Sequence, residues 1–304
     1  MQGARRWGGE IDLRMAPLAT EDDLALVHDP SYIDAIAKLC ASGGGALDPD
    51  TAAVEGSWEA ALRAAGAGLA AATAIQAGES RLAFLAVRPP GHHAHTSRAS
   101  GFCLFNNVAV LAENLTRQGQ RVAIVDWDVH HGDGTQDTFY QRQDVLYVSL
   151  HEFPFYPGSG WVDEVGSGDG LGHTVNVAVP PGTRGDAYDS AFARIVVPVL
   201  GEFAPDWILV SAGYDAHCAD PLADVELEAA DYGRMSAYLS GFNLPVVAFL
   251  EGGYHLEAIE ASVAATLAGL AGTMPEASTG SPGRAHEMVD LAAQVASGHW
   301  RSVR

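Results

Sequence analysis

The amino-acid sequence predicts an α/β fold, with a single, mostly parallel β-sheet flanked by helices on both faces. Short apolar runs alternate with helical segments through most of the chain, which is typical of parallel sheets. The runs are continuous rather than alternating in polarity, as expected for strands covered on both faces. Sites in such sheets gather beyond the carboxyl ends of the strands, so polar residues there predict an active site. Four runs end abruptly in such residues: 81–87, 121–125, 207–211 and 245–250.

The other elements follow from local signals along the chain. Thr20 and the acidic residues after it start a helix, and Pro30 fits the first turn of the next helix. Segment 43–49 is expected to be a loop, and so is the glycine-rich segment 156–172, which opens no helix and therefore predicts no phosphate site. The full set adds strands at 146–150 and 174–179, and helices at 20–28, 30–39, 58–76, 104–118, 185–201, 226–240, 256–272 and 285–296.

Length and composition favour one domain over residues 1–304, in which 273–304 form a linker and a last helix. The 48% hydrophobic content is enough for a buried core. The amino-terminal residues lack the apolar segment of a secretory signal, and residues 64–77 are too few and too mildly apolar to span a membrane. Three scattered cysteines fit a reduced compartment. We therefore expect a cytoplasmic protein without membrane contact.

The net charge is −21, and Lys38 is the only lysine. Such a surface repels phosphate backbones, so we expect no nucleic-acid partner. It could attract cationic substrates such as polyamines or basic protein tails. The acidic residues are dispersed rather than clustered, however, which favours the simpler interpretation that they keep the protein soluble.

The segment after the second run predicts a metal site. Asp126, Asp128 and His130 occupy alternate positions, so the side chains of Asp128 and His130 can converge on one cation. Asp215, after the third run, is the candidate for a third ligand. Two carboxylates and one imidazole leave a coordination position open, as catalytic zinc sites do, and Fe(II), Co(II) or Mn(II) would also fit. The alternative is that the aspartates cap helices or loops and His130 is a core histidine.

The tandem pair His92 and His93 follows the rigid turn Arg88-Pro-Pro-Gly, and proton transfer is its expected task because imidazole titrates near neutrality. A histidine that acts as a base needs a partner on its other ring nitrogen, and Asp126 and Asp133 are available for that. One member of the pair could instead be only a structural hydrogen-bonding group.

Glu251-Gly252-Gly-Tyr254-His follows the fourth run, and its glycines allow a sharp turn that would bring the Tyr254 hydroxyl to an oxyanion. Phe102 and Tyr156 could line a narrow apolar slot for a linear alkyl chain. Taken alone, each of these aromatic residues could equally be an ordinary packed side chain.

Together these motifs resemble the zinc-dependent histone deacetylase family, which includes bacterial acetylpolyamine amidohydrolases and acetoin-utilisation-type deacetylases. The resemblance covers about residues 30–270 and implies the arginase/deacetylase-type fold. Trp127, between two aspartates, is similar to class II members. The segments that carry the resemblance are, in order, RPPGHHA, GFCLFNN, VDWDVHHGDGTQ, SAGYDA with ADPL, and EGGYH.

The resemblance also implies a role for each matching residue. Zn²⁺ would be held by Asp128, His130 and Asp215. His93 would be the general base, His92 its electrostatic partner and Tyr254 the oxyanion donor, with Asp126 and Asp133 orienting the two histidines. A structural K⁺ would be held by Asp126, Ser149 and backbone carbonyls including that of Leu150. The residues implied to bind the substrate are Gly101, Phe102, Tyr156, Leu222 and Gly252.

Several positions depart from the family pattern. His255 stands where class II members often have Asn, and Tyr156 where Phe is usual. Leu222 stands where polyamine-selective relatives of one branch carry Glu, which disfavours a narrow polyamine specificity. His217-Cys-Ala replaces a run of smaller residues. We also expect the family's opening strand to be missing at the amino terminus.

The sequence thus predicts a metal-dependent amidohydrolase that removes acetyl groups from N-acetylated amines. Acetylated protein lysine, an acetylpolyamine and a small acetylated metabolite all remain candidate substrates. The alternatives are a ureohydrolase of the same fold with two Mn(II) ions, and a non-catalytic acyl-lysine binding protein. A homodimer or a tetramer would be compatible with the sequence, which does not decide the oligomeric state.

Overall fold

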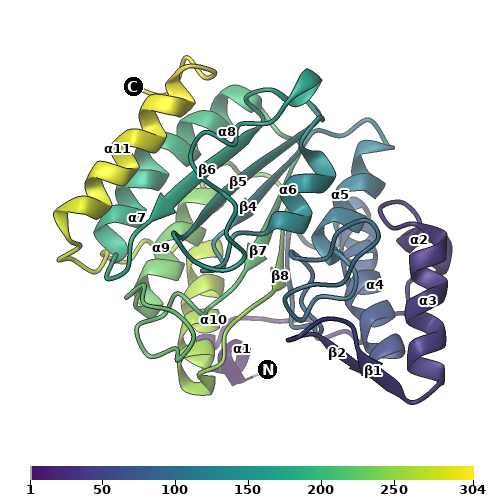
Figure 1. Cartoon of the computed structure of the whole chain (residues 1–304). Coiled ribbons are helices and arrows are strands. Elements are labelled where there is room, and N and C mark those ends of the chain that lie inside the picture. The colour runs from purple at the N-terminus through teal and green to yellow at the C-terminus, as the bar shows by residue number, and fades with distance from the viewer. Residues whose placement is uncertain (1) are drawn as a thin grey trace.

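The computed structural model describes residues 2–304, and its centre is a six-stranded parallel sheet with helices on both faces (Figure 1). All neighbouring strands pair in parallel. This confirms the predicted α/β class and the predicted strands. Across the sheet the order is β3 (Leu82–Leu85), β8 (Val246–Leu250), β7 (Trp207–Ala212), β4 (Val122–Asp126), β5 (Val145–Glu152) and β6 (Thr174–Val179).

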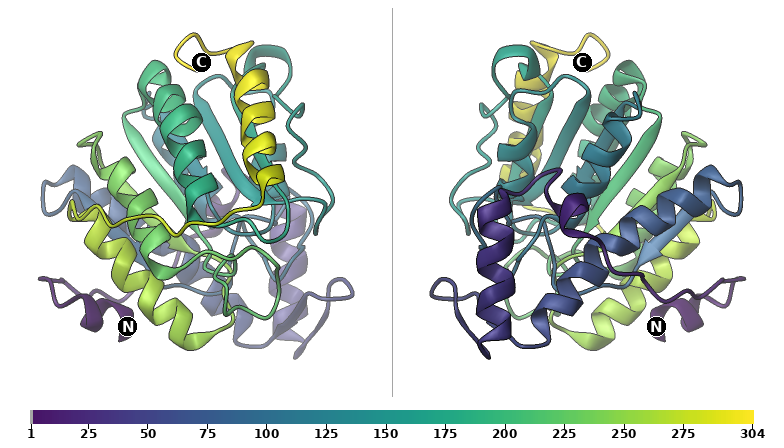
Figure 2. Two further views of the ribbon diagram at one scale, coloured as in Figure 1. Left: turned by 90° about the vertical axis from the view of Figure 1, so that its left-hand side faces the viewer. Right: turned by 90° about the vertical axis from the view of Figure 1, so that its right-hand side faces the viewer.

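The apolar runs form the central strands because both of their faces are covered. Along β4, Val122 and Ile124 belong to one hydrophobic core, whereas Ala123 and Val125 belong to the other. Helices α2 (Glu21–Leu24), α3 (Pro30–Ala41), α4 (Ser57–Gln76) and α5 (Asn107–Thr116) cover the first face. The second face is covered by α7 (Gly185–Ala191), η2 (Phe192–Val196), α8 (Val197–Phe203), α9 (Ala229–Ser240), α10 (Leu256–Leu270) and α11 (Gly283–Ser297) (Figure 2).

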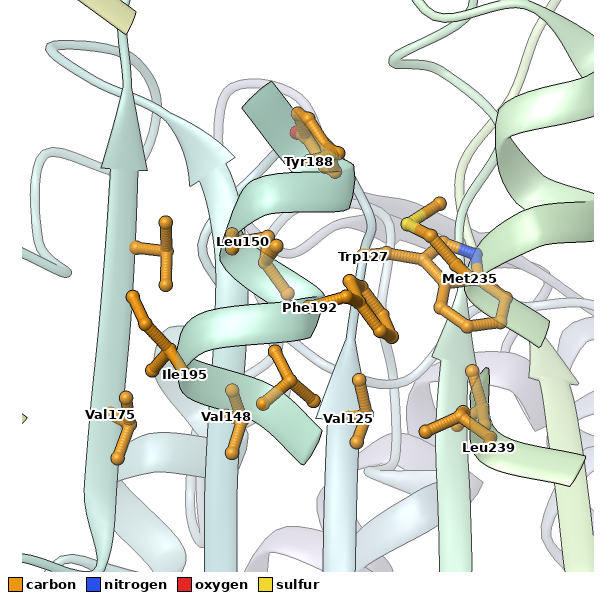
Figure 3. Packing of buried hydrophobic residues seen from close by; sticks show 14 of the residues in the cluster. Val125, Trp127, Val148, Leu150, Val175, Tyr188, Phe192, Ile195, Met235 and Leu239 are labelled. Carbon is orange, nitrogen blue, oxygen red and sulfur yellow. The ribbon is translucent and has the colours of Figure 1, made fainter. Parts of the chain in front are cut away.

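Packing in the core on the second face fixes the direction in which residues 126–130 leave the sheet at the end of β4. Trp127 is fully buried directly after β4, and it lies beside Phe192 of η2 and Met235 of α9 (Figure 3). Leu150 points its side chain into the same core from β5 (Figure 3). Because alternate side chains point to opposite faces, burial of Trp127 sends its neighbours Asp126 and Asp128 away from this core.

Several helices begin where the sequence signals predicted. Thr20 accepts a hydrogen bond from the backbone N–H of Asp23 at 3.1 Å and so caps α2. His255 caps α10, since its Nδ1 accepts from the backbone N–H of Ala258 at 3.2 Å. An imidazole nitrogen thus performs here the N-cap role that Ser, Thr, Asp or Asn oxygens commonly have.

The structure also differs from the predicted elements. The expected loop 43–49 contains β1 (Gly44–Ala46), which pairs with β2 (Ala52–Val54) in a small antiparallel hairpin. Helix α6 (Asp133–Phe139) follows residues 126–130 and was not expected, because its sequence DGTQDTF has no apolar periodicity. The single helix expected at 185–201 is interrupted by the π-helical turn η2. Helix α1 (Gln2–Trp7) packs on α10.

No helix within residues 2–304 is both long and apolar enough to cross a membrane. Residue 1 of the predicted single domain lies outside the described residues. The one-domain organisation and the missing opening strand stay predictions.

We expect Leu209→Ala to lower the free energy of unfolding by about 2–5 kcal/mol, because Leu209 is fully buried in β7 and the change leaves a cavity. The matched change Leu171→Ala, at a residue that is 54% exposed, should alter it by less than about 0.5 kcal/mol. Urea denaturation followed by circular dichroism measures both. Equal losses in the two variants would contradict the assigned core.

Candidate active site

The carboxyl ends of four strands bring the predicted site residues to one edge of the sheet. The segments after β3, β4, β7 and β8 carry His92, Asp128, Asp215 and Gly252, and all four residues line one pocket of about 240 Å³. The same pocket is lined by further residues of the predicted site: His93, Gly101, Phe102, His130, Tyr156, Leu222 and Tyr254.

At the base of the pocket, Asp128, His130 and Asp215 offer ligand atoms that all lie within 4.8 Å of one another. His130 Nδ1 is 3.1 Å from Asp128 Oδ1 and 3.1 Å from Asp215 Oδ2. Both aspartates are buried, and His130 is nearly so. The structure therefore brings the three predicted metal ligands together around one point.

Backbone amides fix the two carboxylates. Gly252 N–H donates to Asp128 Oδ2 at 2.8 Å, and Val129 N–H donates to Asp215 Oδ1 at 2.9 Å. Gly252 lies so close that a Cβ atom on it would be 2.0 Å from Asp215 Oδ2. Gly213 is equally restricted, with a Cβ position 2.0 Å from Asp128 Oδ2. These glycines are therefore required by space and not by backbone conformation.

The donor set fits a divalent cation. Burial, and then repulsion from Asp128, raises the pKa of Asp215 to about 6, which is the electrostatic cost of two buried carboxylates side by side. Burial also opposes the charged form of Asp128, but His92 and His130 outweigh it and lower the pKa of Asp128. A cation among the three ligands would remove the repulsion, and two oxygens with one nitrogen suit Zn²⁺ with an open position.

Each histidine of the tandem pair contacts its own carboxylate. His92 Nδ1 lies 3.1 Å from Asp126 Oδ2, and His93 Nδ1 lies 2.7 Å from Asp133 Oδ1. The ring centroids of the two histidines are 4.0 Å apart. Because both Nδ1 atoms are engaged by carboxylates, each Nε2 is the nitrogen left for chemistry in the pocket. Asp126 is itself held by the Tyr147 hydroxyl, which donates at 3.1 Å.

The two imidazoles differ in acidity although both are buried. Burial lowers the pKa of His92, but the charges of Asp128 and Asp126 outweigh it and raise that pKa well above its ordinary value. Burial, followed by repulsion from His92, lowers the pKa of His93 to about 3. One member of the pair thus favours the cationic form and the other the neutral form, which is the division of charge expected of an acid–base pair.

Two buried acids that the sequence reasoning left without a role fix the loops around the pocket. Glu251 Oε2 accepts from the backbone N–H groups of Gly91 at 2.6 Å and His92 at 3.2 Å. Asp220 Oδ2 accepts from the backbone N–H groups of Tyr254 at 2.6 Å and His255 at 3.1 Å. The sequence signal that could have pointed to Glu251 and Asp220 was their position within the EGGYH and ADPL segments. Burial raises the pKa of Glu251 to about 7.

The rim of the pocket is apolar and partly exposed. Phe102, Tyr156 and Leu222 are 40%, 38% and 42% exposed. The Tyr156 hydroxyl, which a Phe at this position would lack, lies 2.9 Å from Ser100 Oγ and so has a hydrogen-bond partner. Asp50, on the connection between β1 and β2, also lines the pocket. Sequence reasoning missed it because Asp50 lies outside all of the motifs and predicted elements.

The candidate potassium residues lie on neighbouring strands. Asp126 of β4 pairs in register with Ser149 of β5. The Ser149 hydroxyl lies 2.9 Å from His151 Nδ1. Leu150 directs its side chain into the core (Figure 3). The potassium site stays a prediction.

A family model described as the histone deacetylase domain matches residues 5–270 of the chain. The chain belongs to the histone deacetylase family. Within this family it is similar to a probable deacetylase of Archaeoglobus fulgidus, with 41% identity over 245 residues, which are 79% of this chain and 68% of that protein. It is 43% identical over 256 residues to the histone deacetylase-like amidohydrolase of Pseudomonas aeruginosa, covering 80% of this chain and 66% of that protein.

Histone deacetylase 15 of Arabidopsis thaliana is 43% identical over 263 residues, covering 84% of this chain and 48% of that protein. The chain therefore spans about half to two thirds of the length of these family members. The crystal structure of the HDA15 HD domain matches with a TM-score of 0.89 and 39% identity, over 94% of this chain and 81% of that one. The family resemblance and the arginase/deacetylase-type fold are thereby confirmed.

We expect Gly252→Ala to weaken divalent-metal binding by about tenfold or more, because the added Cβ displaces the Asp215 carboxylate. Gly201→Ala is the matched control, since a Cβ at Gly201 in α8 meets no atom within 4 Å. Isothermal titration of the metal-free proteins with Zn²⁺ measures both. Wild-type affinity in Gly252→Ala would show that the two carboxylates do not act together.

Proposed function

We propose that this protein is a zinc-dependent deacetylase that hydrolyses the amide bond of N-acetylated amines such as acetyl-lysine. One observation carries the proposal: a three-ligand cluster and two imidazoles with carboxylate partners meet in one pocket. Membership of the histone deacetylase family supports the same reaction class. Fe²⁺ or Co²⁺ would suit the same oxygen-rich ligands.

Asp128, His130 and Asp215 would hold the metal ion. When bound, it supplies Lewis-acid polarisation of the acetyl carbonyl and lowers the pKa of a water molecule. The backbone amides of Gly252 and Val129 keep the two carboxylates oriented before any ligand arrives, so the site is preorganised. In addition we propose that Asp126, Ser149 and the Leu150 carbonyl hold a structural K⁺ behind this cluster.

The two histidines would divide the proton transfers. His93 accepts the proton of the attacking water at Nε2, because Asp133 occupies Nδ1 and the low pKa of His93 keeps its ring neutral. His92, whose pKa is raised, contributes positive charge next to the reacting carbonyl. After the amide C–N bond breaks, a protonated imidazole returns a proton to the departing amine.

Tyr254 would stabilise the developing oxyanion. It lines the pocket, and Asp220 holds its backbone N–H at 2.6 Å. Burial, followed by the charges of Asp128 and Asp215, raises the pKa of Tyr254, so the hydroxyl stays protonated and can donate. A donor placed in advance is worth more in a buried site than in water.

The pocket fits a linear acylated amine. Phe102 and Tyr156 form an apolar rim, and Asp50 adds one carboxylate that could contact an N–H or cationic group of the substrate. Leu222 at the rim adds no second acid, which favours acetyl-lysine over a polyamine. Turnover of acetyl-lysine peptides, acetylputrescine and acetylspermidine distinguishes these substrates.

The two alternative functions have less support. A binuclear ureohydrolase needs a second ligand cluster, and residues 2–304 contain one group of three candidate ligands, while the tandem histidines contact carboxylates. A non-catalytic binding protein would not require paired imidazoles of opposite charge preference at the base of the pocket.

We expect Tyr254→Phe to reduce kcat on an acetyl-lysine reporter by about a hundredfold or more, because one oxyanion donor is lost. Tyr238→Phe on α9, outside the pocket, serves as the matched control and should keep its activity. Steady-state kinetics measures both variants. Undiminished turnover in Tyr254→Phe would remove this residue from the reaction.

Asp215→Ala should leave the purified protein with little zinc, because one of three ligands is removed. Asp163→Ala, at an exposed residue, should retain the wild-type content. Elemental analysis gives the content, and added Zn²⁺ should raise the Tm of the metal-free wild type and control but not of Asp215→Ala. Full zinc content in Asp215→Ala would refute the ligand set.

A further inference from the structure

A third histidine, His95, lies outside the pocket lining but contacts the carboxylate that contacts His93. It follows the tandem pair in the sequence, and its side chain is 15% exposed. Its position is fixed locally by a bridge to Arg98 in the same loop and by hydrogen bonds to α6. The sequence reasoning gave His95 no role, because nothing in the motif indicates what its side chain contacts.

The contacts form a continuous chain from α6 to the pocket. Asp133 Oδ1 lies 2.7 Å from His93 Nδ1, and Asp133 Oδ2 lies 3.0 Å from His95 Nε2. The other ring nitrogen of His95, Nδ1, lies 2.8 Å from Asp137 Oδ2. Each oxygen of Asp133 therefore has one imidazole partner, and His95 is itself held at both nitrogens.

A carboxylate held at one oxygen can still rotate about its terminal torsion, which is broad and soft. A second hydrogen bond to the other oxygen fixes the plane of the group. We propose that His95 is a positioning residue, which fixes the Asp133 carboxylate and through it the ring of His93 at the reacting centre. This inference rests on the proposed deacetylase function, in which His93 is the base.

The charges around His95 support this assignment. Hydrogen bonds to Asp133 and Asp137 raise the pKa of His95 to about 9, against the opposing effects of burial and of Arg98. Below that pH the ring is cationic and carries two N–H donors, one for each carboxylate. Arg98 is exposed, its Nη2 lies 2.6 Å from His95 Nε2, and its positive charge opposes the cationic form of the ring.

A further neighbour of His95, the buried residue His28, favours its neutral form. His28 Nδ1 lies 3.0 Å from the backbone carbonyl of His95, and burial lowers the pKa of His28 to about 4. The positive charge that faces Asp133 from outside the pocket therefore comes from His95 and, beside it, from Arg98. A cation on the outer oxygen draws charge away from the inner one, which limits the basicity that Asp133 gives to His93.

The first test compares two substitutions of His95. We expect His95→Phe to lower kcat about tenfold or more with KM changed less than about twofold and with zinc content unchanged, because the ring of His93 is less well held. His95→Gln keeps a donor near Nε2 and should recover most of kcat. His286→Phe on α11 is the matched control and should behave as wild type. Equal losses in His95→Phe and His95→Gln, or a change confined to KM, would overturn the proposal.

A double-mutant cycle distinguishes positioning from a general effect on stability. In an Asp133→Asn background the link from His95 to His93 is already weakened, so adding His95→Phe should lower kcat by less than about twofold. A further loss as large as in the wild-type background would show that His95 acts by another route, and would overturn the inference.

A measurement that does not depend on catalytic activity separates this inference from the proposed function. The short hydrogen bond between His93 Nδ1 and Asp133 should give a proton resonance far downfield in the NMR spectrum of the wild type, absent in Asp133→Asn. We expect His95→Phe to shift or broaden it and His95→Gln to preserve it. An unchanged resonance in His95→Phe would overturn the positioning role, whereas a shifted resonance in a protein without deacetylase activity would refute only the proposed function.

Discussion

The structure depends on holding two buried carboxylates, Asp128 and Asp215, at one point against their mutual repulsion. Covalent neighbours alone cannot do this, because the two residues are far apart in the sequence. The parallel sheet does it by ending β4 and β7 side by side, and backbone amides from Val129 and Gly252 then orient the carboxylate oxygens. The remaining polar residues of the pocket are arranged around this charged pair.

Much of that arrangement consists of acids that bind backbone or imidazole N–H groups. Asp126 and Asp133 hold the rings of the tandem histidines, while Glu251 and Asp220 hold the backbone of the neighbouring loops. Each of these four acids lies in or next to a segment that carries a pocket residue. The loops at the carboxyl edge are therefore fixed by hydrogen bonds to acidic side chains, and those to an ionised carboxylate are stronger than neutral ones.

The sequence was sufficient to predict the sheet, its strands and the residues that line the base of the pocket. Those predictions worked because a continuous apolar run followed by polar residues has a direct physical meaning at the edge of a parallel sheet. The roles of Glu251, Asp220 and His95 were missed because their partners are backbone amides or distant carboxylates, which no residue type reveals. Helix α6 and the β1–β2 hairpin were missed because neither is apolar enough to show a period.

The base and the rim of the pocket differ in how readily they accommodate amino-acid substitutions. At the base, Gly213 and Gly252 leave no room for even one added carbon atom beside the carboxylates. At the rim, the side chains of Phe102, Tyr156 and Leu222 are more than a third exposed and come from separate loops. Substitutions at the rim can therefore be accommodated within one loop at a time, whereas a single carbon atom added at Gly213 or Gly252 displaces a carboxylate at the base.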